Sequence, residues 1–184
     1  NERNKSFDSC RGVIETLAGG FFCGSYATCS IPDIDRAHRL GQGVMLDNGA
    51  FSIWRSGKGD IDIPDYWLWT ERWIECPTTW AVVPDRIEGD WVENMGLVEQ
   101  TPRELLGNPN KLGIVWHLHD PIDRLIGMAG YWPRICFGSS AQYAQVGSES
   151  WHRRIGEAFD ALYQRSRYPP AIHMLRGMSC VRMP

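Results

Sequence analysis

Long apolar runs are missing from this sequence. No stretch approaches the roughly 20 apolar residues that a helix needs to cross a bilayer. The first residues, NERNKSFDSC, have neither the apolar core nor the cleavage site of a signal peptide. We therefore expect a cytoplasmic protein without a membrane partner.

A dominant charge is also missing. The chain has 19 Lys and Arg residues against 22 Asp and Glu residues, a net charge of −3. This balance gives no overall positive field that would attract nucleic acid, so such a partner would need a local basic patch. The charge balance alone therefore excludes few functions.

Several cofactor and metal motifs are absent. There is no G-x-G-x-x-G, no H-E-x-x-H, and no C-x-x-C among the six cysteines. We therefore expect reduced cysteines, no cofactor and no resident metal. With 184 residues, 43% of them hydrophobic, the chain is long enough for one domain, residues 1–184, with a sizeable core.

Six short apolar runs are present, each of strand length and apolar on both faces. Such runs are typical of parallel strands covered by helices. Four segments between them begin with Pro, Asp, Thr or Ser and carry helix signals. In one of them, Thr101 and Glu104 predict a capping box. The runs are residues 20–25, 43–49, 79–85, 112–120, 134–140 and 171–177.

Alternating strands and helices predict an α/β fold. A doubly wound sheet is one candidate and a (β/α)8 barrel of the TIM type is the other. Nearly every run ends in polar residues. A doubly wound sheet would concentrate its ligand-binding groups at one switch point, so we favour the barrel. Such a barrel usually has about 250 residues and eight strands, so we expect this one to be truncated to about six βα units.

The stretch GVMLDNGAFSIW, residues 43–54, has two interpretations. Asn48-Gly49 between apolar flanks is typical of a two-residue hairpin. An acidic residue that ends an apolar run is also typical of a strand entering a loop. We favour the strand-to-loop corner, because the residues beyond Ser52 offer no returning strand.

Polar side chains at the run ends are the candidate site. They would face one rim, because parallel strands direct their carboxyl ends to the same edge. Phe51, Trp54 and Trp116 would form its walls. Trp54 and Trp116 could stack on a base, but for either one alone packing in the core is the favoured role. The polar residues are Asp47, Asp85, His117, His119, Asp120, Ser139, Ser140 and His173.

Each candidate also has a structural interpretation. Asp47 is either a site carboxylate or a turn residue that accepts backbone N–H bonds. Asp85 is either a site residue or the N-cap of the next helix. His117 and His119 lie on one side of their strand by alternation. They hydrogen-bond either neighbouring strands or a substrate or, less favoured, they bind a metal together with His173.

The chain resembles the tRNA-guanine transglycosylase superfamily. MLDNGAF is similar to its DSGGF corner, and WAVVPDRIEGD is similar to the PD corner of its shorter phage and archaeal relatives. CFGSS stands where the family has a glycine-rich base-binding corner, and IHMLRG looks like its H-x-L-G strand. Because the long Q continuation after GAF is absent, the chain looks closer to the phage-type enzymes that insert 7-deazaguanines into DNA than to bacterial queuine enzymes. For a phage-encoded protein this implies the host cytoplasm.

The resemblance implies guanine/7-deazaguanine base exchange in DNA or tRNA through a covalent glycosyl-enzyme intermediate. Asp47 and Asp85 would be the catalytic residues, with Asp47 handling the proton of the base and Asp85 holding its guanine-like edge. The nucleophilic aspartate of the family is expected beyond Pro184. Gly138 and Ser139 would give backbone contacts to the base, and Phe51 would flank its ring. The other substrate-binding residues that we expect at this rim are Asn48, Gly49, His117, His119 and His173.

Two other functions stay open. One is a metal-dependent hydrolase on the same barrel, with the three histidines as ligands. The other is an inactive module that binds a base or nucleotide.

Overall fold

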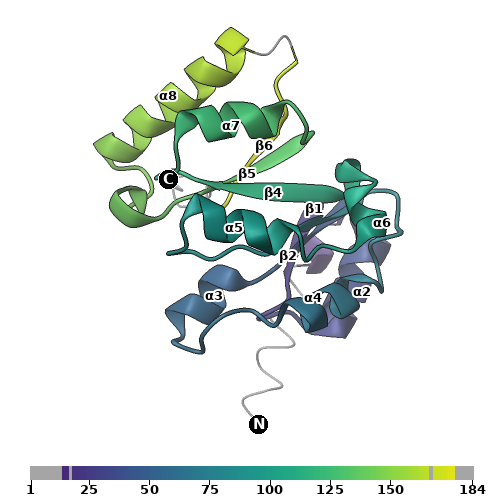
Figure 1. Ribbon diagram of the computed structural model, residues 1–184. Coiled ribbons are helices and arrows are strands. Elements are labelled where there is room, and N and C mark those ends of the chain that lie inside the picture. Colours follow the sequence, from purple (N-terminus) through teal and green to yellow (C-terminus); the bar gives the residue numbers. More distant parts are fainter. Residues whose placement is uncertain (1–13, 17, 166–167, 177–184) are drawn as a thin grey trace. The chain divides into compact units, whose positions relative to one another are not determined.

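The computed structural model describes residues 14–16, 18–165 and 168–176, and the chain is an α/β protein (Figure 1). Its residues group into two compact units, Asn1–Ala81 and Val82–Pro184. Each unit contains parallel strands joined by helices. Among the described residues, none of the helices combines the length and apolar character that crossing a membrane requires.

The first unit contains a parallel sheet in the order β1-β2-β3. Ser25 lies opposite Asp47 at the carboxyl ends of β1 and β2. Ile34 of α2 packs on Gly24 of β1, where a Cβ atom would overlap the Ile34 side chain. The elements are β1 (Phe21–Ser25), α2 (Ile31–Leu40), β2 (Gly43–Asp47), α3 (Ala50–Arg55), α4 (Ile63–Thr70) and β3 (Thr79–Val82).

The second unit begins at the last residue of β3 and contains the parallel strands β4-β5-β6. Val83 donates its N–H to the Gly113 carbonyl of β4 (2.9 Å), which ties the chain after β3 to this unit. The elements are α5 (Trp91–Val98), α6 (Arg103–Leu106), η1 (Pro109–Lys111), β4 (Leu112–His117), α7 (Ile122–Ala129), β5 (Arg134–Gly138), η2 (Ala141–Tyr143), α8 (Glu149–Arg165) and β6 (Ala171–Met174).

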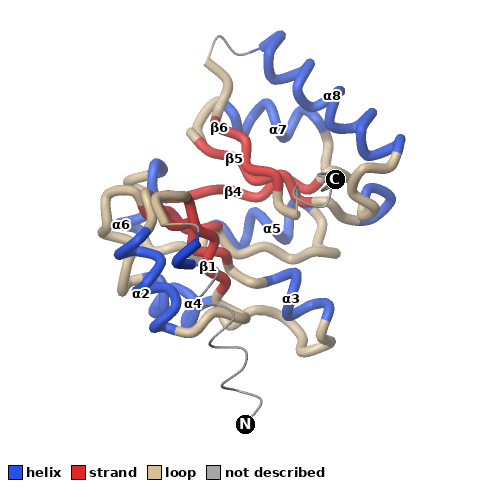
Figure 2. The backbone as a smooth tube through the Cα atoms, turned by 180° about the vertical axis from the view of Figure 1, so that it is seen from behind, coloured by secondary structure: helices blue, strands red, loops and turns tan. Residues whose placement is uncertain are grey.

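Helices α7 and α8 lie on one face of the sheet formed by β4, β5 and β6, and His117 lies on the other face. Figures 1 and 2 show α7 and α8 on the same side of these strands. Phe137 of β5 points to that side, since its ring lies 5.8 Å from the ring of Phe159 in α8. Strand alternation places His117 and Gly138 on the opposite face.

All six apolar runs of the sequence contain a strand, and the alternation of strands and helices is confirmed. Gly177, which ends the sixth run, lies outside the described residues, as do Cys10 and Cys180. The four described cysteines are free thiols; Cys136 is buried, and Cys23 is exposed although its run is apolar.

Helix starts follow local capping chemistry. Ser30 forms a capping box with Asp33 in α2, and Asp90 forms one with Glu93 in α5. The capping box predicted at Thr101 is wrong: α6 begins after Pro102, and no side chain caps it. Thr101 instead ends the preceding turn, with its N–H bonded to the Val98 carbonyl (3.0 Å).

Candidate functional site

The corner after β2 is a strand-to-helix turn. β2 pairs in parallel with β1 and β3, and α3 begins at Ala50, so the hairpin interpretation is wrong. The Asp47 carboxylate accepts the Gly49 N–H (3.0 Å), and the Asn48 side-chain oxygen accepts the Ala50 N–H (2.8 Å). Asp47 therefore has the turn role that the sequence left open, and its half-buried carboxylate also lies at the carboxyl end of a strand.

Gly49 is required by this corner. Its φ is +75°, and a Cβ atom there would lie 2.6 Å from Ala27 Cβ and 2.8 Å from the Ala27 nitrogen. We expect Gly49→Ala to lower the free energy of unfolding by about 2–4 kcal/mol, because left-handed strain adds to the overlap. Urea denaturation measures the loss.

Gly57 provides the matched control for Gly49. It also has a positive φ, +68°, but a Cβ atom there would meet nothing within 4 Å. Gly57→Ala should therefore cost only the strain, about 1–2 kcal/mol. Equal losses in the two variants would contradict the packing argument for Gly49.

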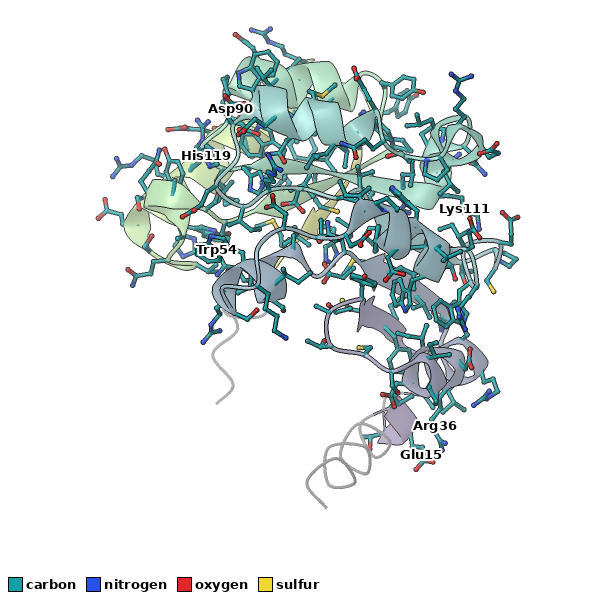
Figure 3. The ribbon with its side chains drawn as sticks, turned by 60° about the horizontal axis from the view of Figure 1, so that its bottom comes forward. Glu15, Arg36, Trp54, Asp90, Lys111 and His119 are labelled. Atoms are coloured by element: carbon teal, nitrogen blue, oxygen red, sulfur yellow. The ribbon has the colours of Figure 1, made fainter. Side chains whose placement is uncertain are left out.

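The aromatic walls predicted for the rim are only partly in place. Phe51 is half-buried in α3, with its ring 5.7 Å from that of Trp54, and Trp54 is 43% exposed (Figure 3). Trp116 is fully buried between the Phe137 ring and the Arg154 guanidinium. Trp116 thus lies in the helix-covered core, the role that the sequence favours for either tryptophan taken alone, and it does not form a wall of the rim.

Four polar side chains of the second unit lie in contact, and we call them the polar cluster: Asp85, His117, Ser140 and His119. Asp85 Oδ2 lies 3.0 Å from His117 Nε2, a close contact in which the N–H is not aligned as in a full hydrogen bond. Ser140 Oγ lies 3.3 Å from His117 Nδ1 and 2.8 Å from His119 Nδ1. The cluster thus forms a continuous polar chain from Asp85 to His119.

Strand ends position the polar cluster. His117 is the last residue of β4, Ser140 follows β5, and Asp85 follows β3 through Pro84. The turn after β4, closed by the Asp120 N–H on the His117 carbonyl (2.8 Å), brings His119 back beside His117. Asp85 does not cap α5, because that role belongs to Asp90.

Gly138 leaves room for the His117 imidazole. The two residues are opposite each other in the β4–β5 register. A Cβ atom on Gly138 would lie 2.7 Å from His117 Nδ1, closer than real Cβ atoms approach. The glycine of the FGSS corner therefore sets the position of a cluster imidazole.

Ser139 and Ser140 have different partners. The Ser139 hydroxyl accepts the Trp151 indole N–H (2.9 Å), and the Arg176 guanidinium donates to the Ser139 carbonyl. Ser140 directs its hydroxyl to the two imidazoles. Ser139, predicted to bind the base through its backbone, therefore has a carbonyl that already bonds Arg176.

Arg154 of α8 supports the turn that carries His119, and the sequence analysis missed it. Its guanidinium donates to the Leu118 carbonyl (2.8 Å) and the Asp120 carbonyl (2.6 Å). It also lies over the Trp116 ring, with its Cζ 5.4 Å from the ring centroid. Its only sequence mark is a position among basic residues in HRRIG, which is also typical of a solvated helix face.

His173 lies within β6 rather than at its end. It is opposite Cys136, two residues before the level of Gly138 and His117. Burial, and secondarily Arg134, lower the pKa of His173 below its ordinary value. His173 is half-buried. Its register places it in the sheet, away from the level of the polar cluster.

The lowered pKa of His173 predicts a pH effect. The folded state favours neutral His173, so its contribution to stability is complete above the unfolded pKa of about 6.5 and is lost as pH falls towards the lower folded pKa. NMR titration of the imidazole should give a midpoint below that value. Arg134→Gln should raise it only slightly, because burial is the larger cause; a full return to the ordinary value would contradict this order.

The described residues contain no group of three His, Cys, Asp or Glu side chains arranged to hold a metal ion. Within the polar cluster, His117 Nδ1 and His119 Nδ1 both face the Ser140 hydroxyl, and His117 Nε2 faces Asp85. These three imidazole nitrogens thus face other side chains of the protein.

An apolar pocket of about 530 Å³ lies between α5 and α7 of the second unit. It is on the helices and contains none of the predicted site residues. Its lining includes Trp91, Met95, Arg124, Met128, Tyr131 and Trp132.

Comparisons of the chain with protein-family models, with curated proteins and with solved structures give no match.

Proposed function

We propose that the protein is a transglycosylase-like enzyme that exchanges guanine for a 7-deazaguanine in DNA or tRNA through a covalent glycosyl-enzyme intermediate. Asp85 would hold the guanine-like edge of the base, and Asp47 would handle its proton. We further propose a barrel of the (β/α)8 type, to which this chain contributes six βα units.

The observation that carries the proposal is the buried Asp85 carboxylate at the carboxyl end of β3, in contact with His117. Guanine presents N1–H and N2–H2 side by side, and carboxylate oxygens accept such donors. In the unliganded protein Asp85 Oδ2 is buried against His117 Nε2, so the carboxylate would meet the base after a local opening on binding. A buried carboxylate favours such donors strongly, because little water competes for it. The pairing also helps to offset the few kcal/mol that extruding a base from its stack costs.

The strand order supports the barrel. In each unit the parallel strands follow one another in chain order, β1-β2-β3 and β4-β5-β6. A doubly wound sheet requires a point at which the order reverses. In such a sheet the reversal places the first strand beside the fourth, whereas here Val83, which directly follows β3, bonds Gly113 of β4, so the chain order continues from β3 to β4.

Base exchange is directly measurable. The full-length protein should release labelled guanine from DNA or tRNA when unlabelled 7-deazaguanine is supplied, and trapping should give a covalent adduct. Running both nucleic acids in parallel identifies the substrate. No release from either one would overturn the proposal.

The other two candidates give different results in the same experiment. A metal-dependent hydrolase would contain stoichiometric metal and would release base or product without an incoming base. An inactive binding module would bind 7-deazaguanine tightly without exchange or adduct. The contacts among His117, Ser140 and His119 favour neither of these over exchange.

A further inference from the structure

We propose that Ser140 joins His117 and His119 into a proton relay between solvent and Asp85. The relay itself follows from the geometry of the second unit. Its use in catalysis rests on the proposed base exchange.

Burial along the polar cluster changes in one direction. Asp85 is 5% exposed, His117 1% and Ser140 3%, whereas the His119 side chain, labelled in Figure 3, is 23% exposed. Of these four side chains, His119 is therefore the one most open to water, and a proton would enter there. The Oγ–N distances of 2.8 and 3.3 Å along the path are within hydrogen-bond reach.

The donors and acceptors fit one arrangement of hydrogens. An ionised Asp85 only accepts, so neutral His117 carries its proton on Nε2, and its Nδ1 is an acceptor. Ser140 then donates its single hydroxyl proton to His117 Nδ1. In this arrangement the hydroxyl oxygen accepts from His119, which carries its proton on Nδ1, while His119 Nε2 lies 3.7 Å from Asp120 Oδ1.

Proton transfer along this path balances. Water protonates His119 at Nε2, the His119 Nδ1 proton moves to Ser140 Oγ, and the original Ser140 proton moves to His117 Nδ1. His119 is left neutral with its proton on Nε2, Ser140 again carries one proton, and His117 becomes a cation beside Asp85. Hydrogen bonds in unliganded sites often align only when substrate binds, which applies to the His117–Asp85 contact.

Base exchange would use the relay at the edge of the base that Asp85 holds. The departing guanine takes up a proton at the nitrogen that leaves C1′, and the incoming 7-deazaguanine gives up a proton when it forms the new bond; Asp47 would handle both protons. That nitrogen lies across the base from the N1–H and N2–H2 edge. The relay would instead pass a proton to His117 beside Asp85 and return it to solvent, so the whole cycle needs no net proton.

A nucleophilic Ser140 accounts less well for the same contacts. Asp85, His117 and Ser140 resemble a catalytic triad in composition. However, the Ser140 hydroxyl lies between two imidazoles and is within hydrogen-bond reach of both, whereas the serine of a triad pairs with one. A Ser140 that passes a proton between the two imidazoles accounts for both contacts.

The test reads the histidine tautomers directly. Long-range ¹H–¹⁵N spectra of the full chain with ¹⁵N-labelled histidine should show His119 protonated at Nδ1 and His117 at Nε2 at neutral pH. Ser140→Ala should move His119 to the Nε2–H form that is commoner for free imidazole. Thr101→Val, which removes another buried hydroxyl of the second unit, should leave both tautomers unchanged.

Kinetics provides the second readout. Ser140→Ala should lower kcat for exchange by 10- to 100-fold with little change in KM for the base, because Ser140 moves a proton and does not hold the base. Tautomers that are the same in wild type and Ser140→Ala would overturn the relay, even if exchange occurs. The expected tautomers without any exchange would instead overturn the proposed function and leave the relay standing.

Discussion

An Asp85→Asn protein is expected to lose base exchange by about 10²- to 10⁴-fold, the usual effect of removing a group that handles a proton or its charge. Asparagine keeps the size of the side chain. However, it replaces one acceptor oxygen by an NH2 group, which faces the donor edge of guanine with another donor. It also removes the charge beside His117 Nε2.

The measurement is the rate of labelled guanine release by wild type and variant at equal concentrations. Asp160→Asn changes an exposed carboxylate of α8 in the same unit and should exchange at the wild-type rate. Normal exchange by folded Asp85→Asn would remove Asp85 from the mechanism. An Asp47→Ala protein with normal exchange would likewise leave Asp47 only its turn role.

Gly138→Ala is expected to destabilise the second unit by about 1–3 kcal/mol, the typical cost of overpacking a buried site. The new Cβ atom would lie 2.7 Å from His117 Nδ1 and 3.4 Å from a methyl carbon of Val115. The imidazole must therefore move, and it carries contacts to both Asp85 and Ser140. Exchange should fall together with stability.

Urea denaturation measures the stability loss, and the His117 ring signals report its displacement. Gly156→Ala is the matched control, because Gly156 lies in α8 with nothing within 4 Å of an added Cβ. That change should be neutral or stabilising by up to about 1 kcal/mol, since alanine favours a helix. A Gly138→Ala protein as stable as wild type, with unmoved His117 signals, would contradict the packing argument.

The strands could be predicted because each is a short apolar run bounded by polar or glycine residues. β2 is the clearest case: Val44, Met45 and Leu46 are all buried, as expected for a strand covered on both faces. The end of the run at Asp47 and the absence of a returning strand were enough to predict the corner. These features depend only on neighbouring residues.

Side-chain partners could not be predicted in the same way. Trp116 and His117 are adjacent, yet one packs under α8 and the other joins the polar cluster, and only the strand's orientation decides which. Ser139 and Ser140 are adjacent too, yet the Ser139 hydroxyl bonds Trp151 and the Ser140 hydroxyl contacts the imidazoles. Arg154 contacts the turn after β4 from a helix more than 30 residues later.

The sequence by itself determined the order of strands and helices, the corner at Asp47 and the set of polar residues that follow the strands, because local apolar patterning and turn chemistry act over a few residues. Only the tertiary structure decided that Asp85, His117, Ser140 and His119 touch. Their contacts depend on the register between neighbouring strands, the bend of the turn after β4 and the absence of a side chain at Gly138.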